Sequence, residues 1–397
     1  MSTSPTDEPL GRAHRVKLGD LAASAGIRRV HILAWRDLAD VEAGGSEVHA
    51  ATVARIWAEA GIEVFMRTSY AQGSPPRAIR DGYEVYRRAG RYAIFPRAAL
   101  AELSGRHGRR DALVEIWNGV PFFSPLWATG PRVTFLHHHH EKMWPLVLPP
   151  RYARLGSLLE SRVAPLVYRR TTIVTLSESS RRDLVQNLHL NAKRIRVVPP
   201  GIDERFSPGG ERSPHPLVVA VGRLMPSKRF DDLIRAMVEV RERRPDAELV
   251  IVGDGYERDN LRARIDELGL SGSVRLAGRV SDDELVALYR RAWLVASASI
   301  SEGWGMTLTE AAACGTPAVA TRIAGHEDAV VDGETGLLVP VGGDLAGAIS
   351  RVLLDESLRA RLGAGARAHA ARYTWEATAF GTMQALVDDA RRRRRRP

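Results

Sequence analysis

Cysteine and long apolar runs are both scarce in this chain. Cys314 is its one cysteine, so an intramolecular disulfide framework is excluded. The longest uncharged stretch, residues 116–131, has 16 residues and contains three prolines, so it is too short and too interrupted for a membrane-spanning helix. The first 21 residues are polar and lack the apolar core of a signal peptide. We therefore expect a cytoplasmic protein.

Length and composition are those of a globular protein. The chain has 397 residues, which is long for one domain and comfortable for two. Hydrophobic residues make up 44% and charged residues 26%, so sizeable cores can form. Global disorder and collagen-like structure are excluded.

The net charge is +10, and the six arginines of residues 391–396 supply most of it, since 10 − 6 leaves +4 for the rest. Such a run is either a solvated tail or a contact to anionic lipid. No recognition motif or aromatic-studded basic repeat supports a nucleic-acid partner, so none is expected.

Apolar runs followed by turn residues and periodic helices recur through the first half of the chain. Residues 1–27 are expected to be a flexible leader. A strand–loop–helix–strand unit typical of parallel sheets then follows, with its helix at 47–60. The predicted strands of this half are residues 29–34, 63–67, 83–86, 113–116, 132–136, 172–176 and 194–198. The further predicted helices are residues 97–105, 152–168 and 178–187.

Residues 199–216 are the stretch richest in proline, glycine and serine, which predicts an interdomain linker. A second alternating series follows, in which Ser281 and Glu284 form a capping box for a helix over 282–292. Its predicted strands are residues 217–221, 248–252, 273–276, 294–296, 318–320 and 337–339, and helices from about residue 344 close the chain. The pattern predicts an α/β protein of two doubly wound parallel sheets. The expected domains are 28–205 and 206–375, with a C-terminal helix and basic tail at 376–397.

Ligands of open parallel sheets bind beyond the carboxyl ends of strands, so the residues after each strand are the site candidates. Gly44 and Gly45 follow the first strand and open a helix, whose free N–H groups can meet phosphate. His137, His138, His139 and His140 follow a later strand. Successive residues of an extended segment point to opposite faces, so all four cannot easily ligate one metal ion, and no spaced carboxylate set completes a site. A sugar or phosphate contact, a structural role and a metal site remain open.

Two further segments of the second half carry charged side chains beside glycines. Arg223 and Lys228 lie five residues apart on a loop that enters a helix, where both cations can meet a diphosphate. Glu302 lies on a glycine-rich loop, and Glu310 lies eight residues later inside the following helix. The loop amides can hold phosphate and the carboxylates can accept hydrogen bonds from sugar hydroxyls. An ordinary strand–loop–helix connection gives the same pattern.

The segment from Glu302 through Gly303, Gly305 and Glu310 to Pro317 resembles the paired-glutamate signature of the bacterial family 4 retaining glycosyltransferases. Residues 222–228 resemble that family's diphosphate-binding loop. Residues 252–255 and 332–338, and Gly44-Gly45, are also similar to it. The resemblance covers nearly the whole chain after residue 27 and is weakest over 70–112. It implies the GT-B fold, which has two Rossmann-like domains facing across a cleft.

The resemblance also implies roles. Arg223 and Lys228 would neutralise the donor diphosphate, Glu310 would hold the ribose and Glu302 the transferred sugar. A histidine would line the sugar site, with His138 favoured over His137 and His140. The remaining expected donor contacts are Gly44, Gly45, Gly303, Gly305, Met306 and Thr307.

The expected activity is retaining hexosyl transfer from a nucleotide-diphosphate sugar to a glycan, lipid or small-molecule hydroxyl, as in cell-envelope glycan biosynthesis. No cofactor and no metal are expected, because the cations take the metal's role. The alternative is a GT-B-fold sugar-nucleotide epimerase or phosphorylase. A dinucleotide-dependent oxidoreductase is disfavoured, because no Gly-x-Gly-x-x-Gly follows the first strand.

Nine arginines between residues 77 and 110, interspersed with aromatic residues, suggest a membrane contact. Each arginine near an anionic surface can add about 1 kcal/mol. Peripheral attachment at the cytoplasmic leaflet, with the C-terminal arginines as helpers, is therefore one hypothesis. A solvated basic face is the other.

Overall fold

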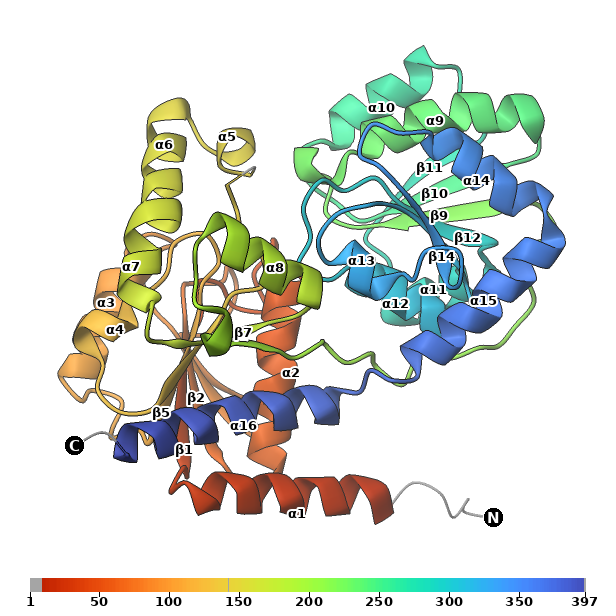
Figure 1. The fold of residues 1–397 in the computed structure, drawn as a ribbon. Helices are drawn as coiled ribbons and strands as arrows, with labels where there is room; N and C mark the ends of the chain where they lie inside the picture. Colours follow the sequence, from red (N-terminus) through yellow and green to blue (C-terminus); the bar gives the residue numbers. More distant parts are fainter. Residues whose placement is uncertain (1–8, 142, 396–397) are drawn as a thin grey trace. The chain divides into compact units, whose positions relative to one another are not determined.

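The chain forms two compact units in the computed structural model, which describes residues 9–141 and 143–395. The first unit contains the described residues up to Leu176, Ser180–Gly201 and the described residues from Trp375 onward. The second contains Ser177–Ser179 and Ile202–Thr374. Each unit has its own mostly parallel sheet flanked by helices (Figure 1). The predicted α/β class with two Rossmann-like sheets is confirmed. The chain passes from the first unit to the second between residues 201 and 202, inside the predicted linker.

The sheet of the first unit has eight strands in the order β3-β4-β2-β1-β5-β6-β7-β8. They are β1 (Arg29–Leu33), β2 (Glu63–Thr68), β3 (Arg77–Arg80), β4 (Tyr83–Arg87), β5 (Ala112–Ile116), β6 (Arg132–Phe135), β7 (Thr172–Thr175) and β8 (Ile195–Val197). All neighbours pair in parallel except β3 and β4, which are antiparallel. The sequence did not predict β3, because its four residues carry only two apolar side chains.

Helices connect these strands, and one of them contains a π-helical turn. They are α2 (Gly45–Glu59), α3 (Ile94–Leu103), α4 (Ser124–Trp127), α5 (Trp144–Val147), α6 (Pro150–Leu158), the π turn η1 (Leu159–Val163), α7 (Ala164–Tyr168), α8 (Glu178–Asn187) and the 3₁₀ turn η2 (Ala192–Arg194). The predicted helix over 152–168 is thus α6, η1 and α7 in series. A π turn inside an α-helix often marks a functional site.

The expectation of a flexible leader over 1–27 is wrong for its described part. Helix α1 (Pro9–Ser24) runs beside the C-terminal helix α16 (Trp375–Arg394), at the opposite end of the sequence (Figure 1). Leu18, Ala22 and Ala25 are buried there, which stabilises the segment by removing apolar surface from water. Residues 1–8 lie outside the described residues.

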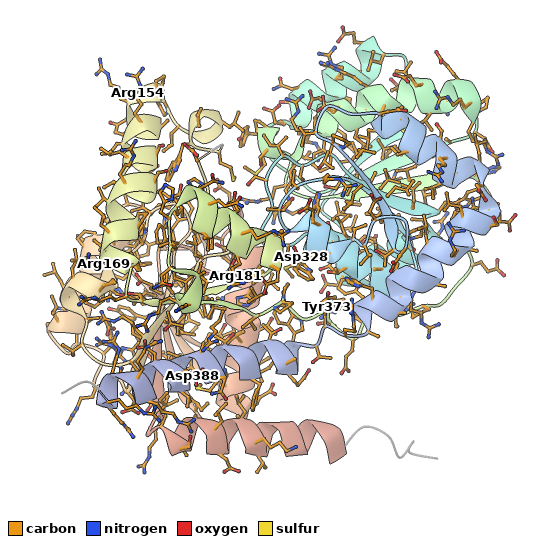
Figure 2. The ribbon with its side chains drawn as sticks, in the orientation of Figure 1. Arg154, Arg169, Arg181, Asp328, Tyr373 and Asp388 are labelled. Carbon is orange, nitrogen blue, oxygen red and sulfur yellow. The ribbon has the colours of Figure 1, made fainter. Side chains whose placement is uncertain are left out.

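Helix α16 belongs to the first unit and is attached to its sheet by acidic side chains. Asp388 (Figure 2) pairs with Arg196 of β8 at 3.5 Å. Asp389 is buried and accepts hydrogen bonds from the Arg132 main-chain N–H (3.0 Å) and from the Thr172 hydroxyl (3.2 Å). Sequence periodicity gives no hint of these contacts, because the partners lie far apart in the chain.

The sheet of the second unit has six parallel strands in the order β11-β10-β9-β12-β13-β14. They are β9 (Leu217–Val221), β10 (Glu248–Val252), β11 (Val274–Gly278), β12 (Leu294–Ser297), β13 (Ala318–Thr321) and β14 (Gly336–Val339). The helices are η3 (Pro226–Lys228, a 3₁₀ turn), α9 (Phe230–Arg243), α10 (Arg258–Glu267), α11 (Asp282–Arg291), α12 (Met306–Ala313), α13 (His326–Ala329), α14 (Leu345–Leu354) and α15 (Glu356–Ala370). All six predicted strands are present, and so is the capping box of Ser281 and Glu284 that begins α11.

The core of the second unit is a continuous apolar cluster between the sheet and its helices. It includes Val218 and Ala220 of β9, Leu233 and Met237 of α9, and Ile349 of α14, all fully buried. This packing fixes the sheet, so the loops at the strand ends project from a rigid base. Within the described part of the chain, no helix combines the length and apolarity that crossing a bilayer requires.

Candidate active site

Strand order identifies the ligand-binding edge of each sheet. In the second unit the chain runs from β9 outward through β10 and β11, then returns to the other side of β9 with β12. The order therefore reverses between β9 and β12, and ligands bind at the carboxyl end of such a switch point. Arg223 and Lys228 follow β9, and Glu302 follows β12. The loops that carry Arg223, Lys228 and Glu302 therefore lie at this switch point.

The loop with Arg223 and Lys228 is fixed by main-chain hydrogen bonds to the loop after β10. Gly222 N–H donates to the Val252 carbonyl and Leu224 N–H to the Asp254 carbonyl, both at 3.0 Å. A Cβ on Gly253 would lie 2.0 Å from the Gly222 carbonyl oxygen, and one on Gly255 would lie 2.3 Å from that of Leu224. Only glycine allows the two loops to approach this closely. These glycines therefore hold in place the loop that carries the cations.

Lys228 ends the turn η3 and forms an ion pair with Glu302. Both side chains are about one-fifth exposed, with fractions of 21% and 20%. Ser299 donates a hydrogen bond to the same carboxylate at 2.9 Å. Burial alone would raise the pKa of Glu302, but attraction to Lys228 and these hydrogen bonds lower it to about 2. Glu302 is therefore a carboxylate at neutral pH.

Gly303 and Gly305 form the turn between β12 and α12. Gly305 has φ +102°, a left-handed conformation suited to glycine, and immediately precedes Met306 and Thr307, the first residues of α12. The first N–H groups of a helix have no partner inside it and point toward an incoming anion. These residues therefore form the beginning of a helix beside Glu302, as the sequence predicted.

His326 belongs to this site but was not predicted. It is buried, and its Nδ1 donates to the Thr321 carbonyl at 2.9 Å, which leaves Nε2 as an acceptor in the neutral ring. A Cβ on Gly305 would lie 3.0 Å from the His326 ring. Burial lowers the pKa of His326 although Glu302 opposes that shift, so the ring is neutral. No motif signals this histidine, because it follows a different strand from Glu302.

Glu310 lies on α12 and is held by a tyrosine from α11. The buried Tyr289 hydroxyl donates to Glu310 Oε2 at 3.0 Å. Among the described residues, Oε1 forms no hydrogen bond. Burial raises the pKa of Glu310 to about 7, although the Tyr289 hydrogen bond opposes that shift. Glu310 thus differs from Glu302 in protonation, which their shared motif did not indicate.

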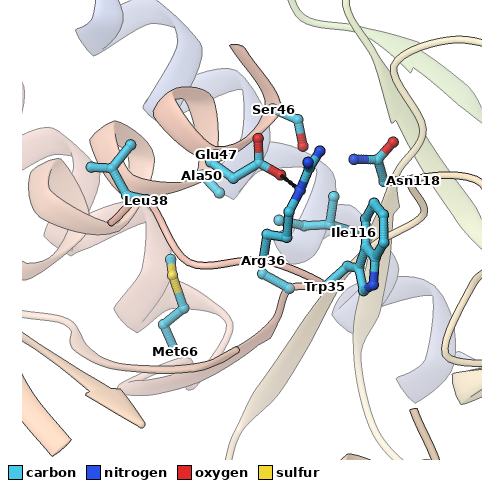
Figure 3. A pocket seen from close by; sticks show the side chains of 10 residues that line it. Trp35, Arg36, Leu38, Ser46, Glu47, Ala50, Met66, Ile116 and Asn118 are labelled. Atoms are coloured by element: carbon cyan, nitrogen blue, oxygen red, sulfur yellow. Dashed lines mark ion pairs between the residues drawn. The ribbon is translucent and has the colours of Figure 1, made fainter. Parts of the chain in front are cut away.

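In the first unit, strand order reverses between β1 and β5, and a small pocket lies there (Figure 3). Gly44 and Gly45 begin α2 beside it. Glu47 reaches back to accept the Gly44 N–H at 2.9 Å, and its other oxygen lies 3.4 Å from Arg36 Nε (Figure 3). The beginning of this helix is therefore capped by its own glutamate, which Arg36 neutralises.

The four histidines differ sharply in their surroundings. His137 is buried against His49, with ring centroids 5.0 Å apart, and burial lowers its pKa well below the usual value. His139 is buried, with Nε2 3.3 Å from the Ser161 hydroxyl. His140 is buried between Asn118 and Glu160. His138 is half-buried, and its ring centroid lies 4.2 Å from that of His140. His138 is thus the most accessible of the four.

The described residues contain no group of three or more histidine, cysteine or acidic side chains arranged to hold a metal ion. Cys314 is buried, and burial raises its thiol pKa to about 11, so the thiol is protonated at neutral pH.

Two family profiles match the chain. The profile described as "Glycosyltransferase Family 4" matches residues 43–206, and that described as "Glycosyl transferases group 1" matches residues 202–369. A D-inositol 3-phosphate glycosyltransferase of Acidothermus cellulolyticus is 33% identical over 400 residues, which cover 89% of this chain and 87% of that protein. One of Corynebacterium jeikeium is 36% identical over 229 residues, which cover 52% of this chain and 55% of that protein.

Solved structures show the same fold. Sucrose-phosphate synthase from Thermosynechococcus elongatus has a TM-score of 0.76 at 21% identity, with 89% of this chain and 96% of that one covered. Anabaena HepE, in complex with UDP and glucose, has a TM-score of 0.68 at 20% identity, with 89% and 98% covered. The match to these structures confirms the predicted GT-B fold.

Proposed function

Because the chain belongs to the family 4 glycosyltransferases, we propose that it transfers a sugar from a nucleoside diphosphate donor with retention of anomeric configuration and without a metal ion. The observation that carries this proposal is the convergence of the cationic loop and Glu302 at the β9/β12 switch point. An epimerase or phosphorylase, the alternative from the sequence, is not favoured by the matched relatives, which are transferases.

The cations act on the leaving group. Breaking the glycosidic bond to the diphosphate places negative charge on its β-phosphate. Lys228 and Arg223 meet that charge, with the beginning of α12 at Gly305–Thr307 as a further partner. Fixed cations and dipoles of this kind stabilise developing charge without reorganising, so they do what a metal ion does elsewhere.

The two glutamates bind different parts of the donor. Glu310 accepts hydrogen bonds from the ribose hydroxyls through Oε1, while Tyr289 holds Oε2. Glu302, a carboxylate with a pKa of about 2, accepts from hydroxyls of the transferred sugar. A negative charge beside the anomeric carbon also favours an oxocarbenium-like transition state. The family resemblance also assigns His138 to the transferred sugar.

The acceptor is a hydroxyl of a glycan, lipid or small molecule. D-inositol 3-phosphate is the first acceptor to test, because two relatives are named for it. UDP is the first nucleotide to test, because the HepE structure contains it.

The structure weakens the argument for a membrane contact. Arg80 and Arg87 pair with the buried Asp37, at 2.8 and 3.2 Å. Other arginines of the region pair with acidic side chains as well, namely Arg77 with Glu84, Arg91 with Asp40 and Glu42, and Arg110 with Glu102. Arg88, Arg97, Arg106 and Arg109 are exposed. The C-terminal run also has internal contacts, since Arg394 donates to the Ala25 carbonyl at 2.8 Å. Peripheral attachment remains a proposal, tested by co-sedimentation with anionic vesicles at low and high salt.

A thermal-shift screen followed by a transfer assay tests the proposed function. UDP, GDP, ADP and their sugars are added to the protein in EDTA, and a bound nucleotide stabilises the fold by about 2.7 kcal/mol at 100 times its dissociation constant. The nucleotide sugar found is then incubated with and without acceptor. Release of the nucleoside diphosphate that depends on the acceptor supports sugar transfer. Equal release in both incubations contradicts sugar transfer.

A further inference from the structure

Glu160 lies in the π turn η1 of the first unit, and its side chain is fully buried, with 0% exposed. A carboxyl group out of contact with water is costly unless hydrogen bonds compensate for the loss of solvation. Glu160 was not among the predicted site residues, because it follows the histidines by 20 residues and matches no spacing rule.

Three hydrogen bonds connect this carboxyl to His140 and Trp144. His140 donates its main-chain N–H to Glu160 Oε1 at 3.1 Å, and His140 Nδ1 lies 3.1 Å from the same oxygen. Trp144 donates its indole N–H to Oε2 at 2.8 Å. Both oxygens are therefore engaged, and both partners lie just after β6.

The indole of Trp144 has a fixed place as well. A Cβ on Gly119 would lie 2.9 Å from the ring, and one on Gly156 would lie 2.7 Å from it. Two glycines from separate elements thus leave room for this one ring. The indole fits only because both of these positions lack a side chain, so the packing around it is specific.

The second ring nitrogen of His140, Nε2, also has a hydrogen-bond partner. His140 Nε2 lies 2.7 Å from Asn118 Oδ1, so Nε2 carries the proton and Nδ1 accepts. The proton between Nδ1 and Oε1 then comes from Glu160. Burial raises the pKa of Glu160 to about 7 and lowers that of His140 to about 3, which agrees with a neutral pair.

We propose that Glu160 is a positioning residue for sugar transfer: its buried carboxyl, held by Trp144, fixes the main chain and ring of His140 and thereby the place of His138, whose ring lies against it. This inference rests on the proposed function, in which His138 contacts the transferred sugar. Glu160 itself touches no substrate. Outer partners of site histidines typically contribute 10–100-fold to activity in metal sites, and an effect of about that size is expected here.

Two variants and a matched control test the proposal. Glu160→Leu keeps the volume but removes all three hydrogen bonds. Glu160→Gln keeps two, since its amide can donate to His140 Nδ1 and its carbonyl can accept from Trp144. Glu141→Gln is the control, because Glu141 directly follows His140 in the chain and its side chain is 59% exposed.

The kinetic readout separates positioning from general damage. Glu160→Leu should lower kcat about 10–100-fold while the dissociation constant of the nucleotide, which binds in the second unit, stays the same. Glu160→Gln should fall between wild type and Glu160→Leu, and Glu141→Gln should match wild type. Wild-type kcat in both Glu160 variants would overturn the proposal. So would a loss of nucleotide affinity equal to the loss of kcat.

A second readout does not depend on activity. At pH 6, where Glu160 with its pKa of about 7 is largely protonated, the ring ¹⁵N chemical shifts of His140 should show one neutral tautomer protonated at Nε2 in wild type and tautomer exchange in Glu160→Leu, with the signals assigned by comparison with His140→Gln. A mixture of tautomers in wild type would overturn the proposed contact. If the tautomer is fixed but no nucleotide sugar is turned over, the proposed function fails while the contact between Glu160 and His140 stands.

Discussion

Lys228 and Glu302 form an ion pair in the second unit although 74 residues separate them. The cation proposed for the donor diphosphate is thus held by the carboxylate proposed for the sugar. The proposed function requires Lys228 to exchange part of its contact with Glu302 for the phosphate when the donor binds. The pair keeps Lys228 in place before the donor arrives, and such preorganisation is what electrostatic catalysis requires.

Replacement of either cation should abolish most turnover while the fold survives. Lys228→Ala and Arg223→Ala each remove a fixed charge that matters most as the leaving diphosphate forms, and we expect a loss of kcat of about 10²–10³. Arg235→Ala is the matched control, because Arg235 is an exposed residue of α9. Steady-state kinetics measures all three. Near wild-type turnover in both Lys228→Ala and Arg223→Ala would contradict their assignment.

Substitution of Glu302 and of Glu310 should give different kinetic defects. Glu310 is proposed to bind ribose, a contact made in both the ground and transition states, so Glu310→Gln should chiefly weaken donor binding. Glu302 is proposed to lie by the reacting sugar, so Glu302→Gln should chiefly lower kcat. Separate measurement of kcat and of the donor's dissociation constant distinguishes them. Identical defects in the two variants would remove the basis for separate roles.

Donor binding should strengthen with pH through the pKa of Glu310. That pKa is raised to about 7, so the carboxyl is largely protonated at pH 6 and ionised at pH 8. The ionised form is the better acceptor for ribose hydroxyls, so the dissociation constant should fall between these pH values. Calorimetric titration of wild type and Glu310→Gln measures this. The phosphate groups titrate equally in both proteins, so only the difference between them reports on Glu310. Parallel pH profiles would refute the role.

Chelation should leave activity intact. If Arg223 and Lys228 neutralise the diphosphate, the initial rate in EDTA should equal that in its absence. The control is addition of Mn²⁺ or Zn²⁺ to chelated enzyme, which should give no gain. Complete loss in EDTA, restored by either metal, would instead assign a metal site, with the four histidines as its first candidates.

Local patterns predicted most elements and most of the candidate residues. The buried strands and the helix capped by Ser281 could be predicted from the sequence, because apolar runs and cap residues are local signals. Helix α1 was missed because only Leu18 and Ala22 are buried among its residues 16–24, and it is stabilised by packing beside α16 from the other end of the chain. Propensity is a weak signal when tertiary packing provides the stability.

Partners from other elements could not be predicted. Tyr289, His326 and Glu160 hold or flank site residues only because the sheet brings their elements together. The different protonation of Glu302 and Glu310 could not be predicted either, since it depends on burial and on neighbouring groups rather than on spacing in the sequence. Strand order, which places the β9 and β12 loops side by side, is not contained in any local pattern.

The central claim is that the loop with Arg223 and Lys228 binds the donor diphosphate. Calorimetric titration in EDTA, comparing the nucleoside diphosphate found by the screen with its monophosphate, tests this most directly. We predict that wild type binds the diphosphate at least about tenfold more tightly, or about 1.4 kcal/mol, and that Lys228→Ala loses this difference. Equal affinity for the two nucleotides in wild type, or an unchanged preference in Lys228→Ala, would contradict the account.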